Sequence, residues 1–266
     1  MLKVNNLKKY YPLRKKDSEG NFISVKAVDG VSFNIEKGKT LGLVGESGCG
    51  KTTIGKLVLN LIDATGGSIE CDGVKIFDVE NGYKITNRDM LSVRKNMQMI
   101  FQDPYASLDP RKTIGYTVSE GIIKHEKLSK KAALEKAAHI LSLCGMDSSS
   151  LYRYPHEFSG GQRQRVGIAR ALAINPKFVV CDEPTSALDV SVQSQILNLM
   201  LDLKEELGLT YLFISHNISV VRAFCDDIVV MYKGQLVEKG NANEVYENPK
   251  HWYTKELIGA VPKCIH

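Results

Sequence analysis

Hydrophobic and polar positions in the first part of the chain predict two strands and a helix. Val31, Phe33 and Ile35 alternate with polar residues, which is the period of a strand with one buried face. A second apolar run over residues 40–44 predicts another short strand. A glycine-rich loop follows, and apolar positions in residues 52–62 then recur at helical spacing. The predicted order is therefore strand, glycine loop, helix.

Turn and capping signals define the next segments. Asp72 and Gly73 separate two apolar runs and predict a β-hairpin, because glycine meets the positive φ of a two-residue turn without strain. Ser129 can cap a helix that ends before Gly145. The stretch from about residue 103 to residue 157 is therefore expected to be a mostly helical lobe.

The second half of the chain returns to alternating strands and helices. Residues 178–181 and 211–214 are apolar runs, separated by a helical pattern that stops at Gly208. A short helix and a hairpin over residues 228–238 follow. Strands that alternate with helices predict a largely parallel sheet covered on both faces.

Composition fits a soluble globular protein. The chain has 266 residues, 43% of them hydrophobic and 24% charged, which allows one large domain or one domain with an inserted lobe. The formal charge of +5 is spread along the chain, so no nucleic-acid partner is expected. No N-terminal signal region and no run of roughly 18 apolar residues is visible, so we expect a cytosolic chain whose membrane role is peripheral.

The cysteines give no sign of a metal or disulfide framework. They lack C-x-x-C spacing and nearby histidine pairs, so we expect reduced, mostly buried thiols. The six are Cys49, Cys71, Cys144, Cys181, Cys225 and Cys264.

The glycine loop has the pattern G-x-x-x-x-G-K-[ST] of a phosphate-binding loop, placed between a predicted strand and a predicted helix. Its residues are Gly45, Glu46, Ser47, Gly48, Cys49, Gly50, Lys51 and Thr52. Backbone N–H groups of such a loop point at phosphate oxygens, and the helix adds its positive end. Lys51 would neutralise the β and γ phosphates, while the Thr52 hydroxyl would bind Mg²⁺.

A magnesium site needs a carboxylate as well, and the apolar run 178–181 leads directly into Asp182 and Glu183. Asp182 can hold the metal through water, and Glu183 can polarise the attacking water as a general base. An Asp-Glu pair alone would indicate only a solvated strand end, but the upstream loop favours the catalytic interpretation. Because no N-K-x-D guanine-reading motif occurs, ATP is preferred to GTP.

Further segments resemble the nucleotide-binding subunits of ABC transporters over essentially the whole chain. Residues Phe158, Ser159, Gly160, Gly161 and Gln162 are similar to that family's signature L-S-G-G-Q, with phenylalanine in place of leucine. The serine can cap a helix whose positive end points outward, which is a second phosphate-binding device. The resemblance implies head-to-tail dimers in which each signature closes over the partner's ATP.

Other polar residues match further motifs of the family. Gln102 matches the Q-loop glutamine, which senses Mg²⁺ and the γ-phosphate and hinges the helical lobe. Asp189 closes a segment that resembles the D-loop, and His216 matches the switch histidine that contacts the γ-phosphate. Asn217 follows it, where aspartate is commoner.

An aromatic residue near the start matches the position that stacks on adenine in this family. Tyr11 is preferred from its distance to Leu7, Tyr10 is the alternative, and an ordinary core tyrosine is the competing interpretation.

Three segments resemble the oligopeptide and dipeptide importer branch of the family: residues 99–111, 154–172 and 248–254. The last looks like the branch's N-P-x-H-P-Y-T tail, with Trp252 in place of proline. Some members of the branch carry a cysteine-ligated cluster near the C-terminus, but Cys264 stands alone, so no cluster is expected.

The resemblance implies an α/β fold of the P-loop NTPase type, with a RecA-like core, an antiparallel β subdomain and an inserted helical lobe. We expect one ABC ATPase domain over residues 1–266. Its parts are a core over 1–102 and 163–240, the lobe with the signature over 103–162, and a tail over 241–266.

The expected site residues fall into three groups. Catalytic roles are expected for Lys51, Gln102, Glu183 and His216. ATP contacts are expected from Tyr11, Gly45, Glu46, Ser47, Gly48, Cys49, Gly50, Lys51, Thr52, Thr53, Gln102, Ser159, Gly160, Gly161, Gln162, Asp189 and His216. Mg²⁺ ligands are expected to be Thr52, Gln102 and Asp182.

The expected function is ATP hydrolysis coupled to uptake of peptides or a related small solute, at the cytoplasmic face of the cell membrane. The implied partners are a second ABC ATPase subunit, identical or different, two transmembrane permeases, and an extracytoplasmic substrate-binding protein acting through them. A nickel or glutathione importer of the same branch stays open.

Two alternatives are less favoured. A soluble ABC-type ATPase acting on ribosomes or DNA usually has two cassettes or a long coiled coil, and this chain has one cassette. A catalytically dead regulatory subunit is disfavoured by the joint presence of Lys51, Ser159, Asp182, Glu183 and His216.

Overall fold

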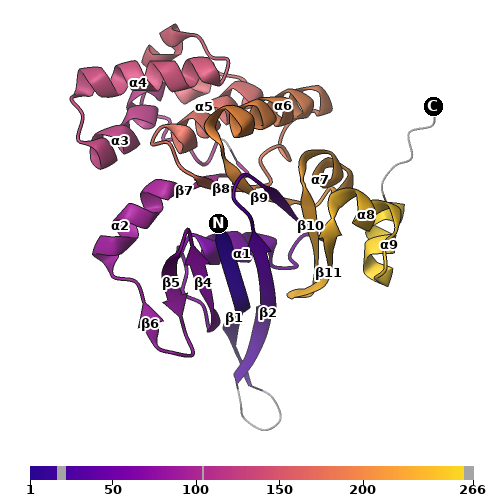
Figure 1. Ribbon diagram of the computed structural model, residues 1–266. Coiled ribbons are helices and arrows are strands. Elements are labelled where there is room, and N and C mark those ends of the chain that lie inside the picture. The colour runs from indigo at the N-terminus through magenta and orange to yellow at the C-terminus, as the bar shows by residue number, and fades with distance from the viewer. Residues whose placement is uncertain (17–21, 104, 261–266) are drawn as a thin grey trace, which may run out of the picture. The chain divides into compact units, whose positions relative to one another are not determined.

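The protein is represented by a computed structural model that describes residues 1–16, 22–103 and 105–260 (Figure 1). Contacts between residues divide it into two units. The first unit comprises Met1–Leu91 with Leu212–His266, and the second comprises Ser92–Tyr211. These units do not coincide with the expected core and lobe, and those domain boundaries stay a prediction.

The first unit contains an antiparallel sheet with the strand order β2-β1-β4-β5-β6 (Figure 1). Its strands are β1 (Leu2–Lys16), β2 (Phe22–Ile35), β4 (Gly66–Cys71), β5 (Val74–Asp78) and β6 (Tyr83–Lys84). The predicted hairpin between β4 and β5 is confirmed. Asp72 and Gly73 have φ of 49° and 79°, the positive values that a tight two-residue turn requires.

A second set of strands in this unit has the order β11-β10-β3-β9. They are β3 (Thr40–Val44), β9 (Thr210–Ser215), β10 (Asp227–Tyr232) and β11 (Gln235–Asn241), and the first residues of β9 belong to the other unit. β10 runs parallel to β3 and antiparallel to β11. Every residue of β3 is buried, which explains why it appears in the sequence as a continuous apolar run.

The helices of this unit are α1 (Lys51–Val58), α7 (Ile218–Phe224), α8 (Ala242–Glu247) and α9 (Trp252–Gly259), and α2 (Asn87–Asn96) crosses into the second unit. The expected helix over residues 52–62 is too long. It ends at Val58, and Asn60 takes a left-handed φ of 51°, which breaks the helical path. Leu61 is therefore 52% exposed rather than part of the buried stripe.

The second unit combines a parallel strand pair with helices. Its elements are β7 (Met97–Ile100), β8 (Phe178–Asp182), α3 (Ile114–Glu126), α4 (Lys130–Leu143), η1 (Ser148–Tyr152), η2 (Pro155–Glu157), α5 (Gly160–Leu172) and α6 (Val190–Leu207). The expected cap is present, because the Ser129 hydroxyl accepts a hydrogen bond from Ala132 N. Gly145 follows α4 with φ of 72°, so the predicted helix between Ser129 and Gly145 is confirmed.

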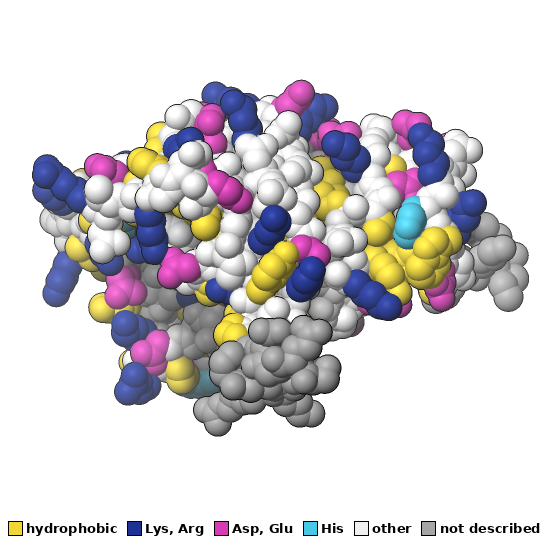
Figure 2. All heavy atoms as spheres, turned by 90° about the horizontal axis from the view of Figure 1, so that it is seen from below, with side chains coloured by type: hydrophobic (Ala, Val, Ile, Leu, Met, Phe, Trp, Pro, Cys, Tyr) yellow, Lys and Arg dark blue, Asp and Glu magenta, His cyan; other side chains and the backbone are white. Residues whose placement is uncertain are grey.

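Five cysteines lie in the described part of the chain, and all five are free and buried. Burial raises the pKa of the Cys144 thiol to about 12. Cys264 lies outside the described residues. On the face seen in Figure 2, basic and acidic side chains are interspersed, as the spread of charge along the sequence predicts. Within the described ranges, no helix has the length and apolar character to cross a membrane.

Candidate functional site

The phosphate loop lies between β3 and α1 and is packed tightly along one side. A Cβ at Gly45 would lie 2.2 Å from the carbonyl oxygen of Met231, and a Cβ at Gly50 would lie 2.1 Å from that of Ala27. Gly50 also has φ of 110°, so the backbone at this position requires glycine. A Cβ at Gly48, in contrast, would meet nothing within 4 Å. The loop therefore has a closed side against β2 and β10 and an open side at Gly48.

Lys51 is the first residue of α1, and its side chain turns back into the loop. It is 4% exposed, and its Nζ donates hydrogen bonds to the carbonyl oxygens of Gly45 at 2.7 Å and Glu46 at 2.8 Å. The Sγ of Cys49 lies 3.9 Å from the same ammonium. Burial still raises the pKa of the Cys49 thiol, although Lys51 acts in the opposite direction. The loop thus holds one buried cation and a protonated thiol, with Thr52 and Thr53 half-buried at the helix start.

The two predicted carboxylates lie at the C-terminal end of β8. Asp182 is the last residue of the strand and is 4% exposed. Glu183 has a left-handed φ of 46°, a strained conformation for a residue with a side chain and one that recurs at functional sites. The N–H and hydroxyl of Ser186 both donate to the carbonyl oxygen of Glu183, at 3.2 and 3.1 Å. This turn fixes the strained residue in place.

Gln102 lies beside Glu183. β7 pairs in parallel with β8, with Ile100 opposite Cys181. Gln102 and Glu183 each lie two residues further along, so they leave the sheet at the same edge. There the Nε2 of Gln102 donates a hydrogen bond to the Oε2 of Glu183 at 3.2 Å. The expected base and the expected sensor of γ-phosphate are therefore in direct contact within the second unit.

The signature segment begins α5 with a reciprocal cap. The Ser159 hydroxyl accepts from Gln162 N at 3.3 Å, and the Gln162 Oε1 accepts from Ser159 N at 3.0 Å. A Cβ at Gly161 would lie 2.5 Å from Cγ1 of Val192 in α6, so this glycine is needed for close helix packing as well. Phe158, which replaces the family's leucine, is buried, with the Arg153 guanidinium 4.3 Å from its ring centroid.

Substituting Gly161 with alanine is expected to destabilise the protein by about 1–3 kcal/mol, the usual cost of overpacking a tight contact. Gly167→Ala in the same helix is the matched control, because a Cβ there would meet nothing within 4 Å. The control should be neutral or slightly stabilising, since alanine favours the helix. Urea unfolding of both variants measures the difference. Equal midpoints for the two would show that contact with Val192 does not explain the glycine.

Comparison with known proteins decides the family. Residues 28–186 match the model of the ABC transporter family. The chain belongs to this family. Two relatives from Bacillus subtilis are oligopeptide transport ATP-binding proteins. AppF is 48% identical over 98% of this chain and 78% of its own length. OppF is 52% identical over 90% of this chain and 77% of its own length. The dipeptide transport ATP-binding protein DppF of Haemophilus influenzae is 48% identical over 99% of this chain and 78% of its own.

Solved cassettes have the same fold. A dimeric bacterial ABC transporter cassette matches with a TM-score of 0.78 and 28% identity over 91% of this chain and 99% of that chain. A dimeric ATP-binding cassette bound to ADP and phosphate matches with a TM-score of 0.77, also at 28% identity over 91% and 99%. The predicted family, the α/β fold of the P-loop NTPase type and the assignment as an ABC ATPase are confirmed.

Asp189, the residue expected in the D-loop, is the N-cap of α6 in this ABC protein. Its carboxylate accepts hydrogen bonds from Val192 N at 3.0 Å and from the Ser191 hydroxyl at 2.8 Å. The bond from Val192 N, followed by that from Ser191, lowers the pKa of the Asp189 carboxyl. The structure gives this residue a capping role, and its contact with nucleotide stays a prediction.

His216, the expected switch histidine, follows β9 and is exposed. The next residue, Asn217, caps α7 in place of the commoner aspartate. Its Oδ1 accepts hydrogen bonds from Ser219 N at 3.0 Å and Val220 N at 3.3 Å. Its own N–H donates to the Ser215 hydroxyl at 3.0 Å. The departure from the family pattern therefore preserves the cap of α7 and the backbone path at the histidine.

Tyr10 and Tyr11 differ in their freedom to stack on adenine. The Tyr10 hydroxyl donates a hydrogen bond to Asp29, which raises the pKa of the phenol, and this ring is partly buried. Tyr11 is 41% exposed and pairs with Val25, two residues before the Ala27 that packs against the phosphate loop. These contacts favour Tyr11, and its role in adenine binding stays a prediction.

The expected site residues are divided between the two units. The phosphate loop, Tyr11 and His216 belong to the first unit, while Gln102, Asp182, Glu183, Asp189 and the signature belong to the second. Each set is ordered locally, as described above. Their convergence on one nucleotide stays a prediction. One contact of the loop has no signal in the sequence: the N–H of Glu46 donates a hydrogen bond to the hydroxyl of Tyr253.

The donors expected for Mg²⁺ suit that ion. The described residues contain no group of three or more His, Cys, Asp or Glu side chains placed to hold a metal by themselves. Mg²⁺ in nucleotide sites is held by one or two protein oxygens together with phosphates and water. Asp182 offers a buried carboxylate and Thr52 a hydroxyl at a helix start, so each is a donor of the kind that Mg²⁺ takes, and their sharing of one ion stays a prediction.

Proposed function

We propose that this chain is the ATP-hydrolysing subunit of an importer for peptides or related small solutes. The observation that carries the proposal is its 46–52% identity, over 90–99% of its length, to four ATP-binding proteins named for oligopeptide or dipeptide transport. Glutathione import proteins are 47% identical over 98% of this chain, although it spans only 41% of their length. Glutathione is itself a small peptide, so peptide-like solutes are the common class.

In this proposal the loop over residues 45–52 binds ATP, and the contacting pair Gln102 and Glu183 activates water. The loop over residues 45–52 holds the triphosphate through backbone N–H groups and the Lys51 ammonium. Glu183 takes the proton of the attacking water, and Gln102 orients that carboxylate through the hydrogen bond described above. Mg²⁺, held by Thr52, Gln102 and Asp182, would supply positive charge at the β and γ phosphates.

A dimer completes the site in this proposal. The signature helix α5 carries its positive end at Ser159, a place suited to a second set of phosphate oxygens. In a head-to-tail pair, each signature would close over the ATP of the other subunit. The dimeric cassettes that match this fold support the arrangement. Either a second copy of the chain or a different ABC ATPase could serve as the other subunit.

Transport requires further partners. We propose two transmembrane permeases, which the chain contacts at the cytoplasmic face of the membrane, and an extracytoplasmic binding protein that delivers solute to them. The transport functions named for the relatives support this assignment.

The proposal is tested by purification from native membranes together with an uptake measurement. The tagged chain is expected to co-purify with multispanning membrane proteins, and cells lacking the chain should lose uptake of a labelled tripeptide while keeping uptake of nickel. Restoring the wild-type chain should restore uptake. Co-purification with ribosomes or DNA, or loss of nickel uptake alone, would contradict the peptide importer.

A further inference from the structure

The C-terminal segment 248–254 has no role in the function proposed above, yet it contacts the phosphate loop. Tyr253 is the second residue of α9 and is 1% exposed. Its hydroxyl accepts a hydrogen bond from the backbone N–H of Glu46 at 2.9 Å. Burial raises the pKa of the Tyr253 phenol, so the hydroxyl keeps its proton at neutral pH while it accepts this bond.

The start of α9 is fixed by β11, which keeps Tyr253 in place. The Glu238 carboxylate accepts hydrogen bonds from Lys250 N at 2.7 Å and His251 N at 2.9 Å. The Nδ1 of His251 in turn accepts from Tyr253 N at 3.2 Å and so caps the helix. The backbone N–H groups of Lys250, His251 and Tyr253 are thus all anchored at the start of the helix.

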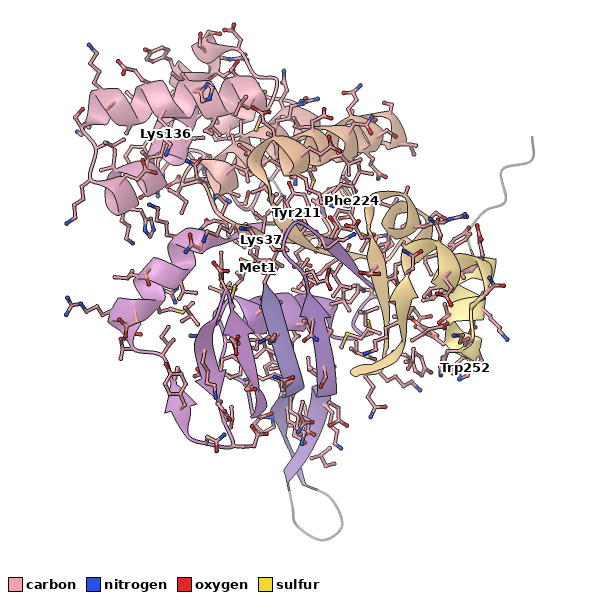
Figure 3. All side chains as sticks on the ribbon, in the orientation of Figure 1. Met1, Lys37, Lys136, Tyr211, Phe224 and Trp252 are labelled. Carbon is pink, nitrogen blue, oxygen red and sulfur yellow. The ribbon has the colours of Figure 1, made fainter. Side chains whose placement is uncertain are left out.

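The Tyr253 ring is held by aromatic packing. Its centroid lies 4.4 Å from that of Tyr232, at the end of β10, and the Trp252 ring packs edge-on against the same Tyr232 at 5.4 Å. Trp252, labelled in Figure 3, is the first residue of α9 and is 56% exposed. Trp252 stands where the branch's N-P-x-H-P-Y-T pattern has its second proline, at the first helical position, where proline is favoured. The substitution lies one residue before Tyr253 and leaves the contact with the loop intact.

Both backbone polar groups of Glu46 are bound by side chains. Tyr253 holds its N–H, and Lys51 holds its carbonyl oxygen. In the role proposed for Lys51 its ammonium turns towards a phosphate, which weakens its hold on that carbonyl. That carbonyl keeps a hydrogen bond from Cys49 N at 3.3 Å, and Tyr253 remains the side chain that holds the Glu46 N–H.

We propose that Tyr253 is a positioning residue of the phosphate loop: its hydroxyl fixes the peptide of Glu46 before nucleotide binds, so that the loop is already shaped for phosphate. The inference rests on the proposed role of residues 45–52 in ATP binding. When only a fraction of the molecules have the loop in its binding conformation, the apparent ATP affinity falls by that fraction. The hydroxyl should therefore affect ATP affinity rather than the chemical step.

The test is Tyr253→Phe, which keeps the ring and removes the hydroxyl. We expect the KM and the Kd for ATP to rise about three- to tenfold, the range that one lost hydrogen bond supports, with kcat within about twofold of wild type. The rise in Tm on adding Mg-ATP at fixed concentration should shrink accordingly. Tyr232→Phe is the matched control, because it removes a hydroxyl from the neighbouring ring. In the described structure that hydroxyl makes no hydrogen bond to the loop, so this variant should leave the Kd for ATP unchanged.

Unchanged ATP affinity in Tyr253→Phe would overturn the proposal. So would a lower Tm of the nucleotide-free protein with no change in Kd, since that would make the contact structural only. Failure of the underlying function is distinguishable, because Lys51→Ala would then also leave ATP affinity unchanged. If Lys51→Ala loses affinity and Tyr253→Phe does not, only the role of Tyr253 is refuted.

Discussion

Replacing Glu183 with glutamine is expected to lower ATP turnover by about a hundred- to ten-thousandfold, the usual contribution of a general base, while the Kd for ATP stays within about threefold of wild type. The glutamine amide has nearly the shape of the carboxylate and can still meet Gln102, which donates to Oε2 of Glu183. It cannot accept a proton from water, so only the chemical step is lost. Phosphate release at saturating ATP and nucleotide titration measure the two effects separately.

The same variant should accumulate as an ATP-bound dimer, because binding is kept and hydrolysis no longer separates the subunits. Light scattering of Glu183→Gln with Mg-ATP is expected to give the mass of a dimer, and the wild type under turnover should give a smaller average mass. Glu206→Gln, an exposed substitution on α6, is the matched control and should behave as wild type. Normal turnover in Glu183→Gln would remove this residue from the mechanism.

The sequence predicts strands well where burial is continuous along the strand. β3 and β8 are buried throughout, and both appear as uninterrupted apolar runs. β1 was missed, although Leu2, Val4 and Leu7 are fully buried. Register shifts on either side of Leu7 break the simple alternation, so the period of two fails where the strand bulges.

The candidate site is predictable to the extent that its motifs are local. The phosphate loop, the carboxylate pair and the cap at Ser159 are each set by a few consecutive residues, and the structure folds each of them as a unit. Contacts between distant segments are not visible in the sequence. Glu46 and Tyr253 lie 207 positions apart, and the need for glycine at position 161 comes from Val192 in another helix.

Replacing Lys51 with alanine is expected to weaken ATP binding about ten- to hundredfold and to lower turnover further, by about a thousandfold. A charge-assisted hydrogen bond to phosphate is worth about 1.5–3 kcal/mol, and each 1.4 kcal/mol changes affinity tenfold. The additional loss in turnover follows because the ammonium also stabilises charge that develops in the transition state. Nucleotide titration and phosphate release at several ATP concentrations check both numbers.

Lys51 also stabilises the nucleotide-free loop, because its ammonium donates hydrogen bonds to the carbonyl oxygens of Gly45 and Glu46. Lys51→Ala should therefore lower the Tm of the nucleotide-free protein as well, and its ATP affinity must be measured below that temperature. Lys56→Ala, an exposed lysine in the last turn of α1, removes the same charge without touching the loop and serves as the matched control. Equal ATP affinity in the two variants would mean that residues 45–52 do not hold the triphosphate, and the roles assigned to Glu183 and Tyr253 would lose their basis.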